Sequence, residues 1–271
     1  MGHSFDPGST SPTLSPLFED YPGDPPYRVK KFRTEWGPVF YRGRLDGSAR
    51  VLVIGQDPAQ HEGIVRRILV GEAGGRVQGF LAKLGIGRGY TMINTFLYSV
   101  YGTPDLNDVS DPEIAGYRNK WLNALLRENR IQVVIALGTL AARSWDVYRA
   151  SPGAVPSNAC FVHITHPTQP ESSSKGKKSK LTAATKQMLE NWNQALQQVQ
   201  KNAGIPGTPG ALVLYGSSFR NDEIAEIPEE DVPPGIPAWM RQRGEWVARV
   251  GATAVLKRAT LRIVVPKNYL S

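Results

Sequence analysis

Four short and almost continuous apolar runs constrain the possible folds more than any other feature of this chain. They are RVLVI (50–54), YTMINTF (90–96), QVVIALG (132–138) and CFVHIT (160–165). Runs of this kind are typical of strands that are buried on both faces of a sheet. Helical patterns lie between them, so strands and helices alternate along the chain. This alternation predicts an α/β fold, a three-layer sandwich with a central, mostly parallel four-stranded sheet flanked by helices.

The predicted helices have recognisable start and stop signals. One is expected from Asp111-Pro112, which supplies an N-cap followed by a proline in the first turn. A second is expected after Gly138, and a third over about 180–202. Each joins two predicted strands or follows the last one, as a parallel sheet with crossover helices requires.

The same patterns divide the chain into three parts. Residues 1–26 carry six prolines with Ser, Gly and Asp, a composition that predicts a disordered arm. Residues 27–204 are expected to form the main domain. Residues 205–271 are expected to form a strand-rich extension that either continues the main sheet or packs as a small lobe. Its predicted strands are ALVLY (211–215), TAVLKR (253–258) and LRIVVP (261–266).

The charge balance narrows the range of partners. The formal net charge is +8, which suits a polyanion, with nucleic acid first and an anionic membrane second. An ordinary basic soluble protein is the alternative. Residues 27–50 are both basic and aromatic, and they could form either a nucleic-acid surface or an amphipathic entry segment.

Cys160 is the only cysteine. The chain therefore has no internal disulfide and no cysteine cluster for zinc or an iron–sulfur centre, and a reducing compartment is the natural setting. The N-terminus has no apolar signal region, and no run reaches the roughly 18–20 apolar residues that a membrane span needs. We expect a soluble, monomeric protein of the bacterial cytoplasm, associated with the nucleoid, with no metal, cofactor or membrane partner.

Polar groups follow three of the four predicted strands. Gln56-Asp57-Pro58 ends the first, Asn94 lies near the end of the second, and His166-Pro167-Thr168 follows the fourth. In open α/β sheets, ligands bind at the carboxyl ends of the strands. Each group alone has an ordinary explanation, such as a turn residue or a satisfied buried amide. Together they predict a functional site that combines a carboxylate, a carboxamide and an imidazole.

The order of these motifs resembles the uracil-DNA glycosylase superfamily over about residues 48–200. Gly55-Gln56-Asp57-Pro58 matches the first four positions of the classical G-Q-D-P-Y-H motif, and His166-Pro167-Thr168 resembles the start of H-P-S-P-L-S. The segment 66–94 is instead similar to the iron–sulfur branch, whose cluster cysteines are missing here. The chain thus resembles a divergent member, with residues 27–204 as the glycosylase-like catalytic domain.

The resemblance implies a base-excision-repair enzyme that flips uracil out of DNA and hydrolyses its N-glycosidic bond. Uracil-containing DNA would be the substrate, and free uracil and an abasic site the products. By motif match, Asp57 would stabilise the sugar cation and hold the attacking water, and His166 would stabilise the departing base. Asn94 would read N3–H and O4 of the base, and main-chain groups around Gln56 would line the pocket.

The sequence departs from the family at several site positions. Ala59 replaces the tyrosine that excludes the 5-methyl group of thymine. Leu69 replaces the stacking phenylalanine, with Phe80 as the nearest aromatic residue after it. Pro170 occupies the place of the intercalating leucine, and a proline can also act as a wedge between bases. The stretch SSSKGKKSK (172–180) is expected to be a mobile loop that either contacts DNA phosphates or is simply solvated; its basic residues are Lys175, Lys177, Lys178 and Lys180.

Three alternatives are open at this point. The first is a glycosylase for another deaminated base, such as hypoxanthine or xanthine, because the tyrosine wall is missing. The second is a protein that binds uracil in DNA without turnover, against which the carboxylate of Asp57 argues. The third is a nucleotide-binding protein, which is disfavoured because Gln-Asp-Pro follows Gly55 where a glycine-rich phosphate cradle would be needed.

Overall fold

A five-stranded sheet forms the centre of the computed structural model, which describes residues 6, 8–102, 104–242, 244 and 246–269. The strand order is β1-β3-β2-β4-β5, in which β2, β3, β4 and β5 are parallel and β1 runs antiparallel to β3 at one edge. The strands are β1 (Tyr41–Gly43), β2 (Val51–Gly55), β3 (Tyr90–Asn94), β4 (Val133–Leu137) and β5 (Cys160–Ile164).

The prediction of a mostly parallel α/β sheet is confirmed, but the predicted number of four strands is wrong. The four apolar runs form β2 to β5, and the edge strand β1 is the fifth. β1 has only three residues, and its central residue Arg42 is fully buried. A short strand built around a buried arginine lacks the apolar run by which the other strands are recognised.

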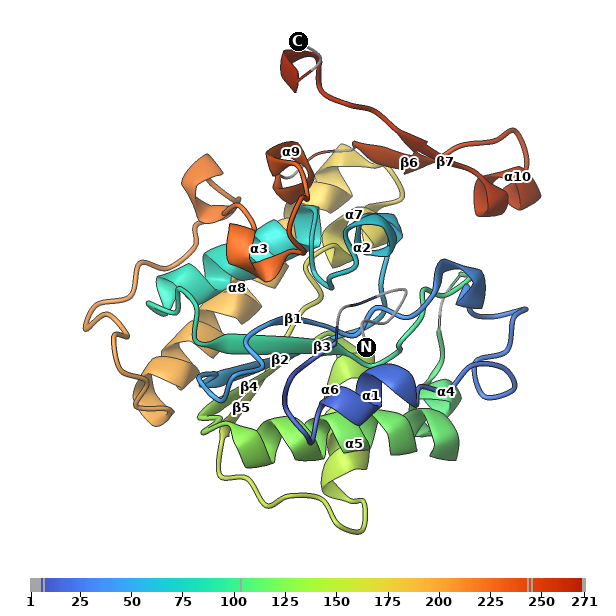
Figure 1. Cartoon of the computed structure of the whole chain (residues 1–271). Helices are drawn as coiled ribbons and strands as arrows, with labels where there is room; N and C mark the ends of the chain where they lie inside the picture. Colours follow the sequence, from blue (N-terminus) through green and yellow to red (C-terminus); the bar gives the residue numbers. More distant parts are fainter. Residues whose placement is uncertain (1–5, 7, 103, 243, 245, 270–271) are drawn as a thin grey trace.

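Helices cover both faces of the sheet and complete three layers (Figure 1). One face is covered by α5 (Pro112–Glu128) and α6 (Thr139–Arg149), together with the short α1 (Ser15–Glu19) and α4 (Leu106–Ser110). The other face is covered by α3 (Glu72–Lys83) and α8 (Lys178–Asn202). The two cores are separate: Trp121 and Tyr148 belong to the first, whereas Phe80 and Trp192 belong to the second.

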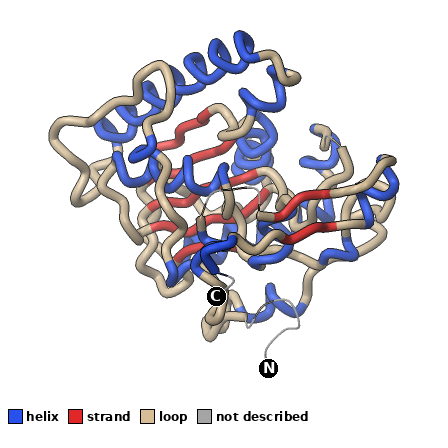
Figure 2. Tube along the Cα trace, turned by 90° about the horizontal axis from the view of Figure 1, so that it is seen from above, coloured by secondary structure: helices blue, strands red, loops and turns tan. Residues whose placement is uncertain are grey.

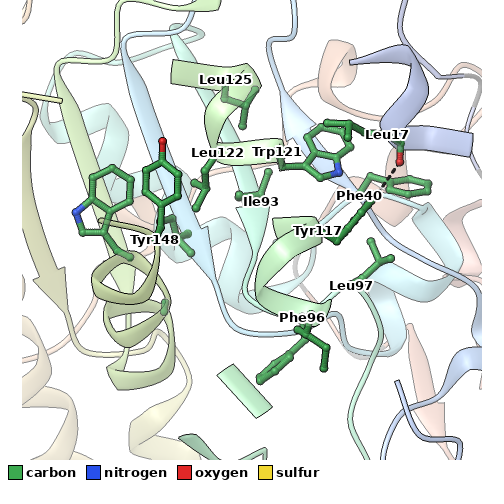
Figure 3. Close-up of a cluster of buried hydrophobic side chains, with 14 of the residues drawn as sticks. Leu17, Phe40, Ile93, Phe96, Leu97, Tyr117, Trp121, Leu122, Leu125 and Tyr148 are labelled. Carbon is green, nitrogen blue, oxygen red and sulfur yellow. Dashed lines mark hydrogen bonds between the residues drawn. The ribbon is translucent and has the colours of Figure 1, made fainter. Parts of the chain in front are cut away.

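The N-terminal segment is part of the first core and not a disordered arm over its described length. Leu14, Leu17 and Phe18 are buried, and the Phe18 ring lies 5.2 Å from that of Trp121. The Tyr117 hydroxyl donates a 2.5 Å hydrogen bond to the carbonyl of Leu17, as Figure 3 shows. The prolines of this segment favour an extended path, but its apolar residues fix that path against the domain. Residues 1–5 and 7 of the predicted arm lie outside the described residues.

The C-terminal extension contains fewer strands than expected. Residues 211–215 form no strand, 253–258 fall mainly in a helix, and only 261–263 of the third predicted strand are extended. The Thr253 hydroxyl accepts a 3.2 Å hydrogen bond from the amide of Leu256, and this N-cap favours the helix. The described elements are η2 (Asn221–Glu223), η3 (Glu229–Asp231), α9 (Ala238–Arg241), β6 (Val247–Arg249), α10 (Ala254–Ala259), β7 (Leu261–Ile263) and η4 (Lys267–Tyr269).

The extension packs on the main domain and does not continue its sheet. β6 and β7 pair with each other in a separate antiparallel sheet, seen to one side of the main sheet in Figure 2. Two buried carboxylates anchor the segment before them. Glu223 accepts from Lys83 of α3 at 2.8 Å, and Asp231 lies between Arg42 and Arg44 at 3.4 and 2.7 Å.

Asp231 is the most completely buried of these anchors. Its other contact is with the Tyr90 hydroxyl, which donates a 2.5 Å hydrogen bond to Oδ2. Asp231 and Arg42 are both fully buried, so each depends on the other for compensation of its charge. This cluster connects β1 and β3 of the main sheet to η3 of the extension.

No helix among the described residues has both the length and the apolar character needed to cross a lipid bilayer.

Replacing Asp231 with alanine is expected to destabilise the protein by about 3–5 kcal/mol, because it leaves Arg42 buried without its counter-charge. Urea denaturation followed by tryptophan fluorescence measures this change. The control is Asp222→Ala, in which an exposed carboxylate loses its pair with Arg220. The denaturation midpoint of the control should stay close to that of the wild type. Equal midpoints for the two variants would contradict the anchoring role of Asp231.

Candidate active site

The candidate site begins where β2 and β3 end side by side. The parallel register pairs Gly55 with Asn94. The Asn94 side-chain oxygen occupies the space in which a Cβ on residue 55 would stand, so any side chain at this position would displace the carboxamide. The glycine that opens the G-Q-D-P motif therefore permits Asn94 to lie directly against the backbone of the motif.

The loop that carries Asp57 is fixed by the chain that follows Asn94. The amide of Thr95 donates to the carbonyl of Gly55, and that of Phe96 to the carbonyl of Gln56, both at 2.9 Å. The Thr95 hydroxyl adds a second 2.9 Å bond to the Gly55 carbonyl. The two strand ends are thereby joined beyond the sheet, which holds the motif loop in one position.

Asp57 itself is held through both carboxylate oxygens. The Gln56 side-chain amide donates to Oδ1 at 3.0 Å, and the backbone amide of Val100 donates to Oδ2 at 3.2 Å. Burial raises the pKa of Asp57 to about 6, and the two hydrogen bonds oppose this rise only in part. At neutral pH the site thus holds a largely desolvated carboxylate that is ionised.

His166 lies at the end of β5 in a defined protonation state. Burial lowers the pKa of His166 to about 4, so the imidazole is neutral at pH 7. Its Nδ1 accepts a 3.3 Å hydrogen bond from the backbone amide of Thr168. Because a backbone amide can only donate, Nδ1 carries no proton and Nε2 carries it. The ring is therefore ready to donate a hydrogen bond through Nε2 without itself being charged.

Gln56 and His166 line one open cleft of about 630 Å³ at the carboxyl edge of the sheet. Gly138, which precedes α6 with a φ of 83°, lines the same cleft, and a Cβ there would approach the His166 Cβ at 3.2 Å. Thr165 and Asn191 form another wall and are joined by a 2.7 Å bond from the Thr165 amide to the Asn191 Oδ1. Asp57 is attached to this cleft through its hydrogen bond with Gln56.

The family model for the uracil DNA glycosylase superfamily matches residues 42–197. This range spans more than half of the chain and contains all the groups just described. The chain belongs to the uracil DNA glycosylase superfamily. The comparison with curated proteins found no match. Membership indicates a DNA glycosylase of base-excision repair, a hydrolase whose macromolecular partner is DNA.

Within this glycosylase domain, Leu69 lies next to the motif loop, whereas Phe80 lies in the core. Leu69 lies close to Gly55, with Cδ1 3.8 Å from the position of a Cβ there, so it borders the G-Q-D-P loop as the motif match implies. Phe80 is fully buried and packs edge-on against Trp192 at 5.4 Å. Phe80, the nearest aromatic residue after Leu69, is thus not placed to stack on a base, because its ring belongs to the core beneath α8. Its apolar character alone could not distinguish these two roles.

The predicted DNA-contacting residues lie at the junction of α7 (Gln169–Ser174) and α8. Pro170 is buried in the first turn of α7, so it presents no exposed wedge in this structure. The stretch 172–180 is not the predicted loop but the end of one helix and the start of the next. Its four lysines, Lys175, Lys177, Lys178 and Lys180, are all exposed.

Ala59 lies at the start of α2 (Gln60–Val65), and its side chain is exposed. The histidine two positions later points elsewhere, since the His61 ring packs edge-on against Trp246 of the extension at 4.8 Å. His61 therefore does not fill the space that a tyrosine at position 59 would occupy. Gln60 lies in a second cleft, which is described below.

Glu62, which the sequence motifs did not indicate, is buried next to the G-Q-D-P motif. Its Oε2 accepts a 3.0 Å hydrogen bond from the amide of Ala59, and this contact ties α2 to the end of the G-Q-D-P loop. Burial raises the pKa of Glu62 to about 7, and the nearby charge of Asp57 raises it further. A glutamate three residues after a helix start is a known capping signal, and that spacing could have identified it.

Arg76 of α3 was also missed, and it positions the His-Pro-Thr loop. Its Nη1 donates to the carbonyl of Pro167 at 2.5 Å, and its Nη2 forms an ion pair with Glu171 at 2.7 Å. The guanidinium lies over the ring of Phe219 at 5.0 Å. No signal in the sequence links this arginine to a loop 91 residues away.

Within the described part of the chain, no group of three or more histidine, cysteine, aspartate or glutamate side chains is arranged to hold a metal ion.

Replacing Glu62 with glutamine is expected to change the pH dependence of stability. The folded-state pKa of Glu62 lies above its usual value of 4.5, so the wild type loses stability as the pH rises from about 4.5 to about 7, because over this range the unfolded chain has released the proton that the folded protein still binds. The variant has no such cost, and its stability relative to wild type should increase by on the order of 2–3 kcal/mol between pH 4 and pH 8. Urea denaturation at several pH values measures the difference, with the exposed Glu190→Gln as control. Parallel curves for wild type and Glu62→Gln would contradict this assignment.

Proposed function

We propose that this protein hydrolyses the N-glycosidic bond of uracil in DNA without a metal or cofactor. The observation that carries the proposal is the pairing of a fixed, desolvated carboxylate with a neutral imidazole that bears its proton on Nε2. Asp57 and His166 come from strands at different positions in the sheet, and Gln56 connects them, since it lines the His166 cleft and donates to Asp57.

The reaction separates charge, and the two groups suit the two charges that develop. The C1′–N1 bond breaks with its electron pair going to the base, the oxygen of a water molecule bonds to C1′, and the proton lost by that water ends on the base. An ionised Asp57 stabilises the positive sugar and orients the water. Nε2–H of His166 donates to the O2 of the base, which becomes negative. Because His166 is neutral, it stabilises this oxygen by hydrogen bonding and need not lose its proton.

Recognition of the base is assigned to Asn94. A carboxamide offers one acceptor and one donor, which match N3–H and O4 of uracil and mismatch the corresponding groups of cytosine. The close contact between Asn94 and Gly55 restricts the movement of this carboxamide. Leu69, beside the same glycine, would supply the apolar surface on which the base rests.

We assign the initial DNA contact to the exposed lysines at the junction of α7 and α8, since α7 follows the His-Pro-Thr loop directly. Lys175, Lys177, Lys178 and Lys180 would contact phosphates on the strand that carries the flipped base. The net charge of +8 fits a polyanion substrate. A monomer acting on nucleoid DNA in the cytoplasm is the working arrangement that we propose.

A second candidate function is excision of another deaminated base, such as hypoxanthine or xanthine. The exposed side chain of Ala59 supports it, because alanine leaves unfilled the space that the family fills with a tyrosine. A single methyl group changes discrimination in an apolar pocket by only about 1–3 kcal/mol. The choice of base therefore depends on which side chain, if any, fills the small volume beside Ala59.

Replacing Asp57 with asparagine is expected to lower uracil excision by a factor on the order of 10² or more, because it removes the charge that faces the sugar cation. Binding to uracil-containing DNA should persist, since the shape and one hydrogen-bond acceptor are kept. Single-turnover excision from a labelled oligonucleotide, followed by alkaline cleavage, measures the rate. Near-normal excision by the variant would overturn the role of Asp57. The wild-type rate should also fall as the pH drops below about 6, where Asp57 becomes protonated.

A panel of bases distinguishes the two candidate functions. Oligonucleotides with one uracil, 5-hydroxymethyluracil, hypoxanthine, xanthine or mismatched thymine are tested in single- and double-stranded form. Uracil is expected to be excised fastest, and Ala59→Tyr is expected to increase the preference for uracil over 5-hydroxymethyluracil. Faster excision of hypoxanthine or xanthine by the wild type would favour the second function, and excision of no base would contradict both.

A further inference from the structure

The hairpin of β6 and β7 is attached to the helix that follows the G-Q-D-P motif. His61 Nε2 lies 3.0 Å from the carbonyl of Gly244, and the His61 ring packs against Trp246 at the start of the hairpin. Trp246 in turn contacts Trp239 of α9 at 5.4 Å. These contacts fix the base of the hairpin on α2, while α10 extends away from the body of the molecule (Figure 1).

Arg249, at the end of β6, lies beside the candidate active site. It lines a second cleft of about 560 Å³ together with Gln60, Arg76 and Glu171. Helix α7 borders both clefts, because Gln169 lines the cleft at His166 and Glu171 lines the cleft at Arg249. The positive charge of Arg249 is also near enough to Asp57 to favour its ionised form and so to oppose the rise in its pKa. A residue far along the chain thus reaches the edge of the site.

The charged residues of the hairpin segment are all basic. Residues 246–271 contain five basic residues and no aspartate or glutamate. Among the described residues, no carboxylate forms an ion pair with Arg249, Lys257, Arg262 or Lys267. The acidic stretch before the hairpin is used differently, since Glu223, Glu229, Glu230 and Asp231 pair with basic residues of this chain.

The hairpin also exposes apolar side chains beside its basic ones. Val255 and Leu256 of α10 are 71% and 49% exposed, and Ile263 of β7 is 44% exposed. A surface that mixes cations with apolar groups fits the sugar–phosphate backbone, whose charges alternate with apolar sugar faces. It also has the composition of a surface that contacts an anionic membrane. Its position beside Asp57 in a DNA glycosylase superfamily member favours DNA.

We propose that the β6–β7 hairpin with α10 is a second DNA-contacting surface, which binds backbone phosphates next to the base that enters the site. This inference rests on the proposed function, because it assumes that the reacting base lies at Asp57. In this arrangement, the hairpin contacts the duplex on one side of α7, and the lysines between α7 and α8 contact it on the other. The burial of Pro170 supports this proposal, because the segment after His166 lacks the exposed wedge of the family. Another surface is then needed to hold the DNA.

The test compares two triple variants that remove the same charge from different places. The hairpin variant is Arg249→Gln, Lys257→Gln and Arg262→Gln. The control variant is Arg127→Gln, Arg149→Gln and Lys201→Gln, whose exposed residues lie near the C-terminal ends of α5, α6 and α8, at the opposite edge of the sheet. Each variant loses three positive charges from the net +8, so general electrostatic attraction to DNA changes equally. All six positions are outside the cores, and thermal melting confirms that both variants fold.

The measurement is the affinity for a uracil-free duplex at several salt concentrations, by fluorescence anisotropy. The hairpin variant is expected to bind at least about 10-fold more weakly at low salt. The slope of its plot of log K against log salt should be smaller in magnitude by up to about 3. The control should keep the wild-type slope. Equal slopes for the hairpin variant and the wild type, or equal losses in both variants, would overturn the proposal. Wild-type DNA affinity combined with lost binding to phosphatidylserine-containing vesicles would overturn it in favour of a membrane surface.

Uracil excision is measured separately, so that the two proposals can fail independently. A wild type that excises no base but whose duplex binding depends on the hairpin would refute the proposed function and leave the second DNA surface standing. A wild type that excises uracil while the hairpin variant binds DNA normally would refute only the hairpin proposal.

Discussion

The close contact between Asn94 and Gly55 is the constraint on which the rest of the candidate site depends. The parallel strands β2 and β3 end in register at these two residues, and the carboxamide takes the space of a missing Cβ. Thr95 and Phe96 then bond to the motif loop, and the loop presents Asp57. A larger residue at position 55 would therefore disturb the carboxamide of Asn94 and the carboxylate of Asp57 together.

Burial, more than ion pairing, sets the protonation states in this site. Asp57 and Glu62 have raised pKa values and His166 a lowered one, and desolvation is the main cause in each case. Asp231, outside this site, has different surroundings, since it lies between two arginines. The protein thus separates a structural carboxylate that lies between two cations from site groups whose protonation is set by burial. The protonation of Asp57 and Glu62 therefore changes with pH near neutrality. Asp231 has a structural role only.

The sequence predicts the parts of this structure that depend on local patterns. The apolar runs identify β2 to β5, and the motif residues at their ends indicate the family and Asp57. What it does not predict depends on contacts between distant segments. β1 is stabilised by a carboxylate from the extension, the segment around Phe18 packs on a helix a hundred residues later, and Phe80 turns from a site candidate into a core residue because α8 covers it. Propensity cannot anticipate such contacts, since each partner lacks a local signal for the other.

The buried cluster around Asp231 has a consequence for how the chain is made. Arg42 leaves the ribosome 189 residues before Asp231, which at roughly 5–20 residues per second is an interval of roughly 10–40 s. Throughout that time the guanidinium must remain hydrated, because its counter-charge does not yet exist. The buried ion pair at the edge of the sheet that holds β1 therefore cannot form on the nascent chain when its own strands have emerged. Its completion waits for a late segment, so newly synthesised protein passes through a stage in which the other strands can already be paired while this edge is open to chaperones and to competing strands.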